Sequence, residues 1–189
     1  VINFISFATG ETVLVNGQEV SVIQRSPINL STNDRYGYEL NITYSPNKKW
    51  RVNGDFNFYN SITKGDYRGV NFDSESFSWR ARISNKYTFP GKIDWQTTLS
   101  YRGPRENSQS KSNGVVSANM AFSKDLFKEN ASIAFNVSDL FNSRKRKTET
   151  LTNTYESYSE FQWRERSFNL SFTYRFNQKK KRTRNREDF

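Results

Sequence analysis

The residues of this sequence that could do chemistry are charged side chains spaced at even intervals along short segments. Arg80 and Arg82 lie two positions apart, and Arg51 and Asp55 lie four apart. An arginine presents a planar fork of donors that matches carboxylates and phosphates, so such residues could bind or select charged solutes in a wet channel. The candidate set is Glu39, Arg51, Asp55, Arg80, Arg82, Lys86 and Asp94. The alternative is a solvated wall whose charges form salt links with one another.

Catalytic chemistry would have to rely on carboxylates, lysines or tyrosines. The chain has no cysteine and no histidine, which removes the usual zinc ligands, a Cys-His pair and a Ser-His-Asp triad. Asp55 with Asp94, or Glu39 with Asp55, could be imagined as a hydrolytic carboxylate pair, but nothing in their spacing supports it. We therefore predict that the protein is not an enzyme, with no catalytic residue, no metal site and no cofactor.

These charges lie on one face of segments in which apolar and polar residues alternate. In RYGYELNITY one face holds Tyr36, Tyr38, Leu40, Ile42 and Tyr44. The alternation recurs in WRVNGDFNFY, SFSWRARISNKY, IDWQTTLSY and RSFNLSFTYRF, and more weakly in VVSANMAF and ASIAFNV. With VINFISF at the start, this predicts about eight strands. We expect residues 18–44 to form one long strand interrupted near Pro27, because proline cannot donate to a ladder.

Composition and connections favour a transmembrane β-barrel over a soluble β-sandwich or lipocalin-like barrel. Hydrophobic residues make up only 34% of the chain, although aromatics reach 16%. This composition suits a sheet with a single apolar face better than a protein with a buried hydrophobic core. The short connections SPNKK, FPGK and KDLFKEN alternate with long polar ones at 60–74, 102–113 and 142–165. Outer-membrane barrels alternate periplasmic turns and extracellular loops in this way. We predict an all-β fold of antiparallel transmembrane strands, with aromatics near the strand ends at the membrane interfaces.

Three segments resemble the late barrel strands of TonB-dependent outer-membrane receptors. RYGYELNITYSPNKKWRVNGDFNFYNS has Gly37 and Glu39 early in one strand, Pro46 in the turn and Trp50 at the start of the next strand. RSFNLSFTYRF resembles the closing strand of that family. NVSDLFNSR resembles its penultimate-strand element through Val137, Asp139, Leu140, Phe141 and Asn142. The resemblance spans most of the chain.

This resemblance implies a receptor of the SusC or ferric-siderophore-receptor type that imports a nutrient across the bacterial outer membrane. Such a barrel has about twenty-two strands and a plugged lumen. We therefore expect residues 1–176 to be a C-terminal sector of the barrel, its wall and extracellular loops. The implied partners are outer-membrane lipid, the remaining strands and plug, TonB-type energy coupling through that plug, the barrel-assembly machinery and a surface lipoprotein. The alternative is a self-contained eight-stranded outer-membrane barrel with a structural or adhesive role.

The last long connection and the final strand add further candidates. Aromatic side chains in TNTYESYSEFQWRER could contact a ligand from outside, or could simply pack on neighbouring loops. They are Tyr155, Tyr158, Phe161 and Trp163. The resemblance also implies that a final strand ending in an aromatic residue is recognised by the barrel-assembly machinery. The residues concerned are Phe168, Phe172, Tyr174 and Phe176.

Basic residues gather in the tail at 177–189 and in the run RKRK at 144–147, and the formal net charge is +10. Basic patches interleaved with aromatics are typical of nucleic-acid-binding proteins. Here, however, the aromatics alternate on the face opposite the charges, whereas a stacking platform needs both on one surface. We therefore predict no nucleic-acid partner, and we expect the tail to be a solvated periplasmic extension.

Overall fold

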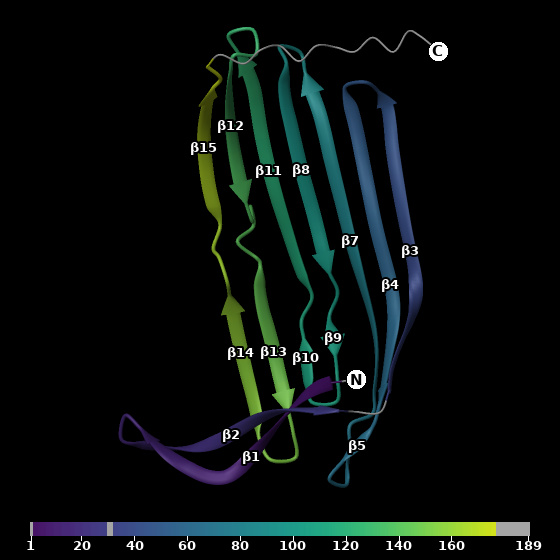
Figure 1. The fold of residues 1–189 in the computed structure, drawn as a ribbon, viewed down its shortest axis with the longest axis vertical. Helices are drawn as coiled ribbons and strands as arrows, with labels where there is room; N and C mark the ends of the chain where they lie inside the picture. Colours follow the sequence, from purple (N-terminus) through teal and green to yellow (C-terminus); the bar gives the residue numbers. More distant parts are fainter. Residues whose placement is uncertain (1, 30–31, 177–189) are drawn as a thin grey trace.

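The protein consists of antiparallel strands, most of which form one broad sheet (Figure 1). The structure is a computed structural model that describes residues 2–29 and 32–176. The main sheet has the strand order β15-β12-β11-β8-β7-β4-β3. Its strands are β3 (Thr32–Asn47), β4 (Trp50–Lys64), β7 (Ser74–Phe89), β8 (Ile93–Arg102), β11 (Val115–Leu126), β12 (Ala131–Ser138) and β15 (Ser167–Tyr174). The predicted all-β, antiparallel fold is confirmed. Within the described residues no helix is long and apolar enough to cross a membrane.

Short and long connections lie at opposite ends of this sheet, as the sequence predicted. The turns that join β3 to β4, β7 to β8 and β11 to β12 share one end, at the top of Figure 1, which we call the short-turn end. At the other end, the long-connection end, the chain runs on as smaller strands. They are β5 (Asp66–Tyr67), β6 (Val70–Asn71), β9 (Arg105–Glu106), β10 (Ser110–Ser112), β13 (Lys145–Leu151) and β14 (Glu156–Gln162). The long connections therefore contain ordered β-hairpins as well as loops.

The N-terminal hairpin is separate from the main sheet, which corrects two expectations. β1 (Ile2–Val15) and β2 (Gln18–Asn29) form their own two-stranded sheet and lie across the long-connection end (Figure 1). VINFISF is therefore not a strand of the main sheet, and residues 18–44 form two strands instead of one. β2 pairs with β1 through the turn at Asn16 and Gly17, which have φ angles of 53° and 81°. Asn-Gly favours this tight hairpin turn because both positions need a positive φ.

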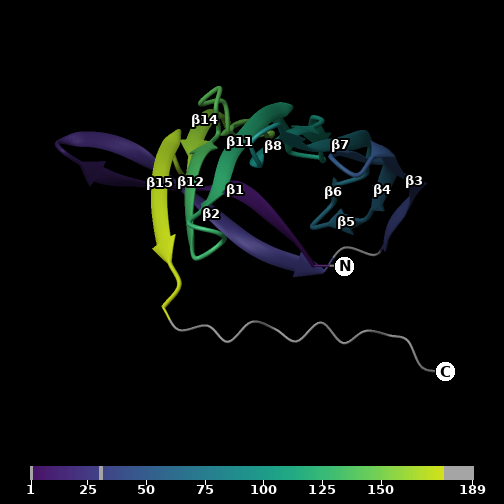
Figure 2. The same ribbon diagram turned by 90° about the horizontal axis from the view of Figure 1, so that it is seen from above.

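Seen along the strands, the main sheet curves into an arc from β3 to β15, and the β1–β2 hairpin crosses its concave side (Figure 2). A small core of Ile5, Ile28 and Phe72, with Phe7 and Tyr67 packed against it, joins the hairpin to the β5–β6 region. Gln109 also binds the β1–β2 hairpin through its side chain. The Gln109 side chain accepts a hydrogen bond from Ser6 N–H at 3.0 Å and donates one to Ser6 O at 2.9 Å.

The apolar face of the main sheet is uncovered. Tyr38 on this face is 83% exposed, and it lies opposite Phe58, which in turn lies opposite Trp79. Across the described residues the buried hydrophobic side chains are few: Ile5, Ile28, Phe72, Ala118, Ala131 and Val137. A soluble sandwich would cover such a face with a second sheet. A large uncovered apolar face suits lipid better than water.

Aromatic rings mark both ends of the apolar face. Near the short-turn end, Trp50 packs edge-on against Tyr87 with ring centroids 6.5 Å apart. Toward the other end, Phe58 stacks on Trp79 at 6.0 Å, and Trp79 contacts Tyr101 at 4.3 Å. Aromatic girdles at the two interfaces are typical of outer-membrane barrels.

Candidate functional site

The polar face of the sheet and the long connections line a hollow of about 1500 Å³. Residues of β4, β7 and β8 line it from the main sheet, and residues of β10, β13 and β14 line it from the long connections. The β1–β2 hairpin contributes residues 3–6 and Arg25. Most of these side chains are polar or charged, so the hollow is a wet chamber.

Four of the seven charged candidates line this hollow: Glu39, Asp55, Arg80 and Arg82. The strand register brings them to a common face. Asp55 lies opposite Arg82, and Asn57 lies opposite both Glu39 and Arg80 on its two neighbouring strands. Side chains two positions apart in a strand share a face, which is why the alternation in the sequence could place them together. Their role in binding a solute stays a prediction.

The other three charged candidates lie toward the short-turn end. Arg51 and Lys86 are opposite each other in β4 and β7 and border a second, smaller hollow. Lys86 Nζ lies 3.3 Å from Asp94 Oδ2, and Asp94 Oδ1 accepts a hydrogen bond of 2.6 Å from Thr88 Oγ1. Lys86 and Asp94 thus form an internal salt link of the kind expected for a solvated wall.

Five arginines that the alternation did not single out as site residues also line the large hollow: Arg25, Arg102, Arg105, Arg144 and Arg146. Lys145 borders the hollow too, but its ammonium group is paired with Glu160. Arg102 lies directly opposite Arg80. It also continues the polar face of β8 two residues after Ser100, so the alternation in IDWQTTLSYR could have identified it. The other positions depend on how the long connections fold, which the alternation does not determine.

The aromatic candidates of the last long connection divide between two faces of β14. Phe161 and Trp163 both line the large hollow, with ring centroids 6.0 Å apart. Tyr158 lies on the alternate face of the strand, opposite Glu149. Tyr155 precedes β14, and its carbonyl oxygen accepts a 2.9 Å hydrogen bond from Thr152 N–H. Two of the four aromatics are therefore placed to contact a solute in the hollow.

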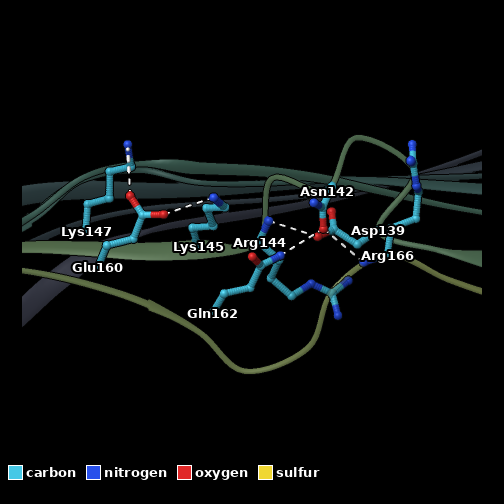
Figure 3. Close-up of polar contacts among 8 residues, drawn as sticks. All are labelled: Asp139, Asn142, Arg144, Lys145, Lys147, Glu160, Gln162 and Arg166. Carbon is cyan, nitrogen blue, oxygen red and sulfur yellow. Dashed lines mark hydrogen bonds and ion pairs between the residues drawn. The ribbon is translucent and has the colours of Figure 1, made fainter.

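A buried carboxylate fixes the junction where the main sheet passes into β13. Asp139 is 2% exposed, and one of its oxygens accepts a hydrogen bond of 3.2 Å from the backbone N–H of Ser143. The other accepts one of 2.9 Å from the backbone N–H of Arg144 (Figure 3). The Asp139 N–H donates to Asn119 Oδ1 at 3.0 Å. This network fixes the chain direction on entry to β13, which carries Arg146 into the hollow.

Asn142 ties β14 to the same junction. Its Oδ1 accepts hydrogen bonds from Gln162 Nε2 and from Arg166 N–H, both at 2.9 Å (Figure 3). Asp139 and Asn142 have φ angles of 51° and 52°, a left-handed conformation that Asp and Asn tolerate better than most residues. The NVSDLFNSR element is therefore a structural connector between the main sheet and the β13–β14 hairpin.

Beyond this junction the outer face changes from apolar to charged. On the β15 side of the junction it carries Phe168 and Leu170, which are 61% and 69% exposed. On the β13–β14 side, the Glu160 carboxylate lies 2.9 Å from Lys145 Nζ and 3.4 Å from Lys147 Nζ (Figure 3). The hydrogen bonds from Lys145 and then Lys147 lower the pKa of Glu160, and the bond to Glu160 raises the pKa of Lys147. Charges on an outer face do not suit lipid, so the lipid-facing surface ends at the junction.

The chain was compared with protein families, curated proteins and solved structures. Residues 3–174 match the model of the outer membrane protein beta-barrel family. The chain belongs to this family. None of the curated proteins and none of the solved structures compared matches it.

Membership of the outer membrane protein beta-barrel family places the protein in the bacterial outer membrane and confirms that expectation. The main sheet is accordingly barrel wall, with its uncovered apolar face toward lipid and its polar face toward the lumen. In the described residues this wall is not closed, because β3 and β15 are the two edges of the sheet.

The proposed assembly signal lies on the lipid side of this barrel wall. Phe168, Phe172 and Tyr174 share the apolar face of β15, and Phe176 follows the strand with its ring centroid 4.6 Å from that of Tyr174. The alternation expected of the final strand is therefore present. The basic tail at 177–189 lies outside the described residues.

Proposed function

We propose that the chain forms C-terminal wall and loops of a TonB-dependent receptor that imports a scarce nutrient. The observation that supports this most is the large hollow on the lumen side, at the end where the long connections gather. In outer-membrane barrels the long connections face the exterior. The hollow would then open to the medium and capture a solute, while Phe161 and Trp163 line it from β14 and the connection that follows. The role is binding and passage, without a catalytic step.

The open edges of the sheet support a sector of a wider barrel. Each edge strand, β3 or β15, has a strand partner on only one side among the described residues. Lipid offers backbone groups no hydrogen-bond partner, so each edge needs a further strand beside it. We propose that other strands of the same receptor continue it and that their plug occupies the lumen. Energy coupling would act through that plug, and a surface lipoprotein would meet the extracellular hairpins.

Uptake profiling tests this proposal. Three strains are grown on a mixture of scarce nutrients: the parent, a strain lacking this protein and a strain lacking the energy-coupling protein. We expect the same solute to disappear from the medium more slowly in both deletion strains, and restoring the full-length gene should restore its uptake. If removing this protein slows uptake but removing the coupling protein does not, the barrel is passive and the proposal is wrong.

A further inference from the structure

We infer that the large hollow binds a multivalent oxyanion, such as a polycarboxylate or a polyphosphate, through Arg80, Arg82, Arg102 and Arg105. This inference deepens the proposed receptor function, on which its biological meaning rests, by naming the class of solute. Binding itself is a property of the hollow and can be measured without import.

The lining of the hollow is strongly cationic. Seven of its residues are arginines, whereas only Glu39, Asp55 and Glu106 are acidic. Glu106 is engaged elsewhere, because its Oε2 lies 4.0 Å from Lys111 Nζ. A cleft lined by one sign of charge focuses the potential and raises the local concentration of oppositely charged solutes.

Arg80 and Arg102 are the centre of this site. They are direct cross-strand neighbours on the lumen face of β7 and β8, and like charges in that relation destabilise a sheet. Neither side chain has a hydrogen-bond or ion-pair partner among the described residues. The same is true of Arg82, although Asp55 lies opposite it in the register. An oxyanion shared by the two guanidinium groups would remove the repulsion between them.

Arg105, the fourth arginine of the proposed site, lies in a segment whose backbone is hydrogen-bonded to β7. Gly103 N–H donates to Trp79 O at 2.7 Å, and Glu106 N–H donates to Ser76 Oγ at 3.2 Å. These bonds fix the segment carrying Arg105 against β7, the strand that carries Arg80 and Arg82. The backbone positions of the four arginines therefore belong to one hydrogen-bonded part of the wall. Their planar forks bind carboxylate or phosphate oxygens in a bidentate manner.

The test measures binding of two probes, citrate and inorganic pyrophosphate, to the full-length receptor in detergent micelles by titration calorimetry. Maltotriose is the neutral probe. We expect both anions to bind and maltotriose not to bind. Binding of citrate alone or of pyrophosphate alone would also support the site and would identify carboxylate or phosphate as the preferred group. Absence of binding by both anions would overturn the inference.

Two double variants locate the site. Arg80→Gln with Arg102→Gln should weaken anion binding at least about tenfold, because each lost charge-assisted bond is typically worth a factor of ten or more. Lys92→Gln with Lys128→Gln removes the same charge from two turns at the short-turn end. This control should change the affinity less than about twofold at 0.1 M salt, where charges more than roughly 10 Å apart are screened. Equal losses in the two double variants would refute the assignment.

A conservative pair of changes guards against misfolding. Arg80→Lys with Arg102→Lys keeps the charge but removes the planar forks, so citrate binding should still weaken. Unchanged affinity in this variant would contradict the inference.

Micelle binding needs no energy coupling, so the two proposals can fail separately. If anion binding depends on the arginines but import does not depend on coupling, the receptor function fails alone. If coupled import continues unchanged in the Gln double variant, the anion site fails alone.

Discussion

The direction of each side chain sets the environment that a residue of this wall meets. Phe172 lies opposite Ile133 on the lipid face of the sheet, and Ser171 lies opposite Ala134 on the lumen face. Although they are neighbours in one strand, Phe172 therefore faces the hydrocarbon of the membrane and Ser171 faces the aqueous lumen. The same rule places Arg80 and Trp79 on opposite faces of β7.

A charged residue should be tolerated on only one of these faces. Phe172→Arg is expected to cost ~2–4 kcal/mol if the residue lies near the midplane, because the guanidinium must enter lipid. Ser171→Arg should cost clearly less, since its side chain enters the lumen. Urea unfolding of the protein in lipid vesicles measures both values. Equal losses would mean that the two faces of β15 are wrongly assigned.

Gly37 illustrates a different constraint, imposed by close approach of the backbone. A Cβ at this position would collide with the carbonyl oxygen of Phe58 and lie 2.6 Å from Tyr59 Cα. Gly37→Val should therefore destabilise the barrel by about 1–3 kcal/mol or prevent pairing of β3 with β4, because overpacking against backbone is hard to relieve. The matched control is Thr43→Val in the same strand, which loses one 3.1 Å hydrogen bond between Thr43 Oγ1 and Asn53 Oδ1. A smaller loss for Gly37→Val than for Thr43→Val, again from urea unfolding, would contradict this explanation.

At the scale of elements, the connector between β12 and β13 separates the lipid-facing wall from the hairpin that lines the hollow. Its buried Asp139 accepts two backbone hydrogen bonds. Asp139→Ala leaves those N–H groups unpaired and should destabilise the β13–β14 hairpin by about 1–3 kcal/mol. Asp125→Ala is the control, since Asp125 is exposed in β11. Amide hydrogen exchange of β13 measures the difference. Equal protection in both variants would show that the connector does not stabilise the hairpin.

The β13–β14 hairpin should also respond to pH through Glu160. Its folded pKa is lowered below the ordinary value of 4.5, chiefly by the hydrogen bond from Lys145. The carboxylate therefore stabilises the hairpin above about pH 4.5, and this contribution is lost as the pH falls through the folded pKa. Carbon-13 NMR of the glutamate-labelled protein in micelles should give a Glu160 titration midpoint below pH 4.5. In Lys145→Gln the midpoint should rise, and an unchanged midpoint would rule out this cause.

The strands could be predicted from the sequence because two-residue periodicity directly reflects the lipid and lumen faces. The charged pair Arg80 and Arg82 was found in this way. Three features needed more than periodicity. The turn at Asn16 and Gly17 pairs β1 with β2 in a hairpin of their own, Asp139 organises a connector within a polar segment, and Arg105 is placed by backbone bonds of its neighbours. These features depend on local hydrogen bonding, which the alternation does not encode.

For the whole molecule, the arc of seven strands defines a wall between lipid and a wet lumen. The lipid face is bounded by aromatic rings, and the lumen face widens into the cationic hollow at the long-connection end. The hairpin β1–β2 crosses the concave side there (Figure 2). The proposed solute capture and the contact with lipid therefore lie on opposite faces of the same strands, so changes on one face need not disturb the other.

Cysteine crosslinking can decide whether this wall closes on itself. Residues 1–189 contain no cysteine, so the introduced thiols have no native thiol partner within this part of the protein. Asn136→Cys with Asn169→Cys should form a disulfide in the outer membrane, because these residues are direct partners in β12 and β15 and cross-strand partners lie within disulfide reach. Asn169→Cys combined with Cys at Glu39, Asn41 or Thr43 of β3 should not, since a wider barrel places other strands between the two edges. A crosslink between β3 and β15 would instead support a small self-contained barrel, and gel mobility without reductant distinguishes the two outcomes.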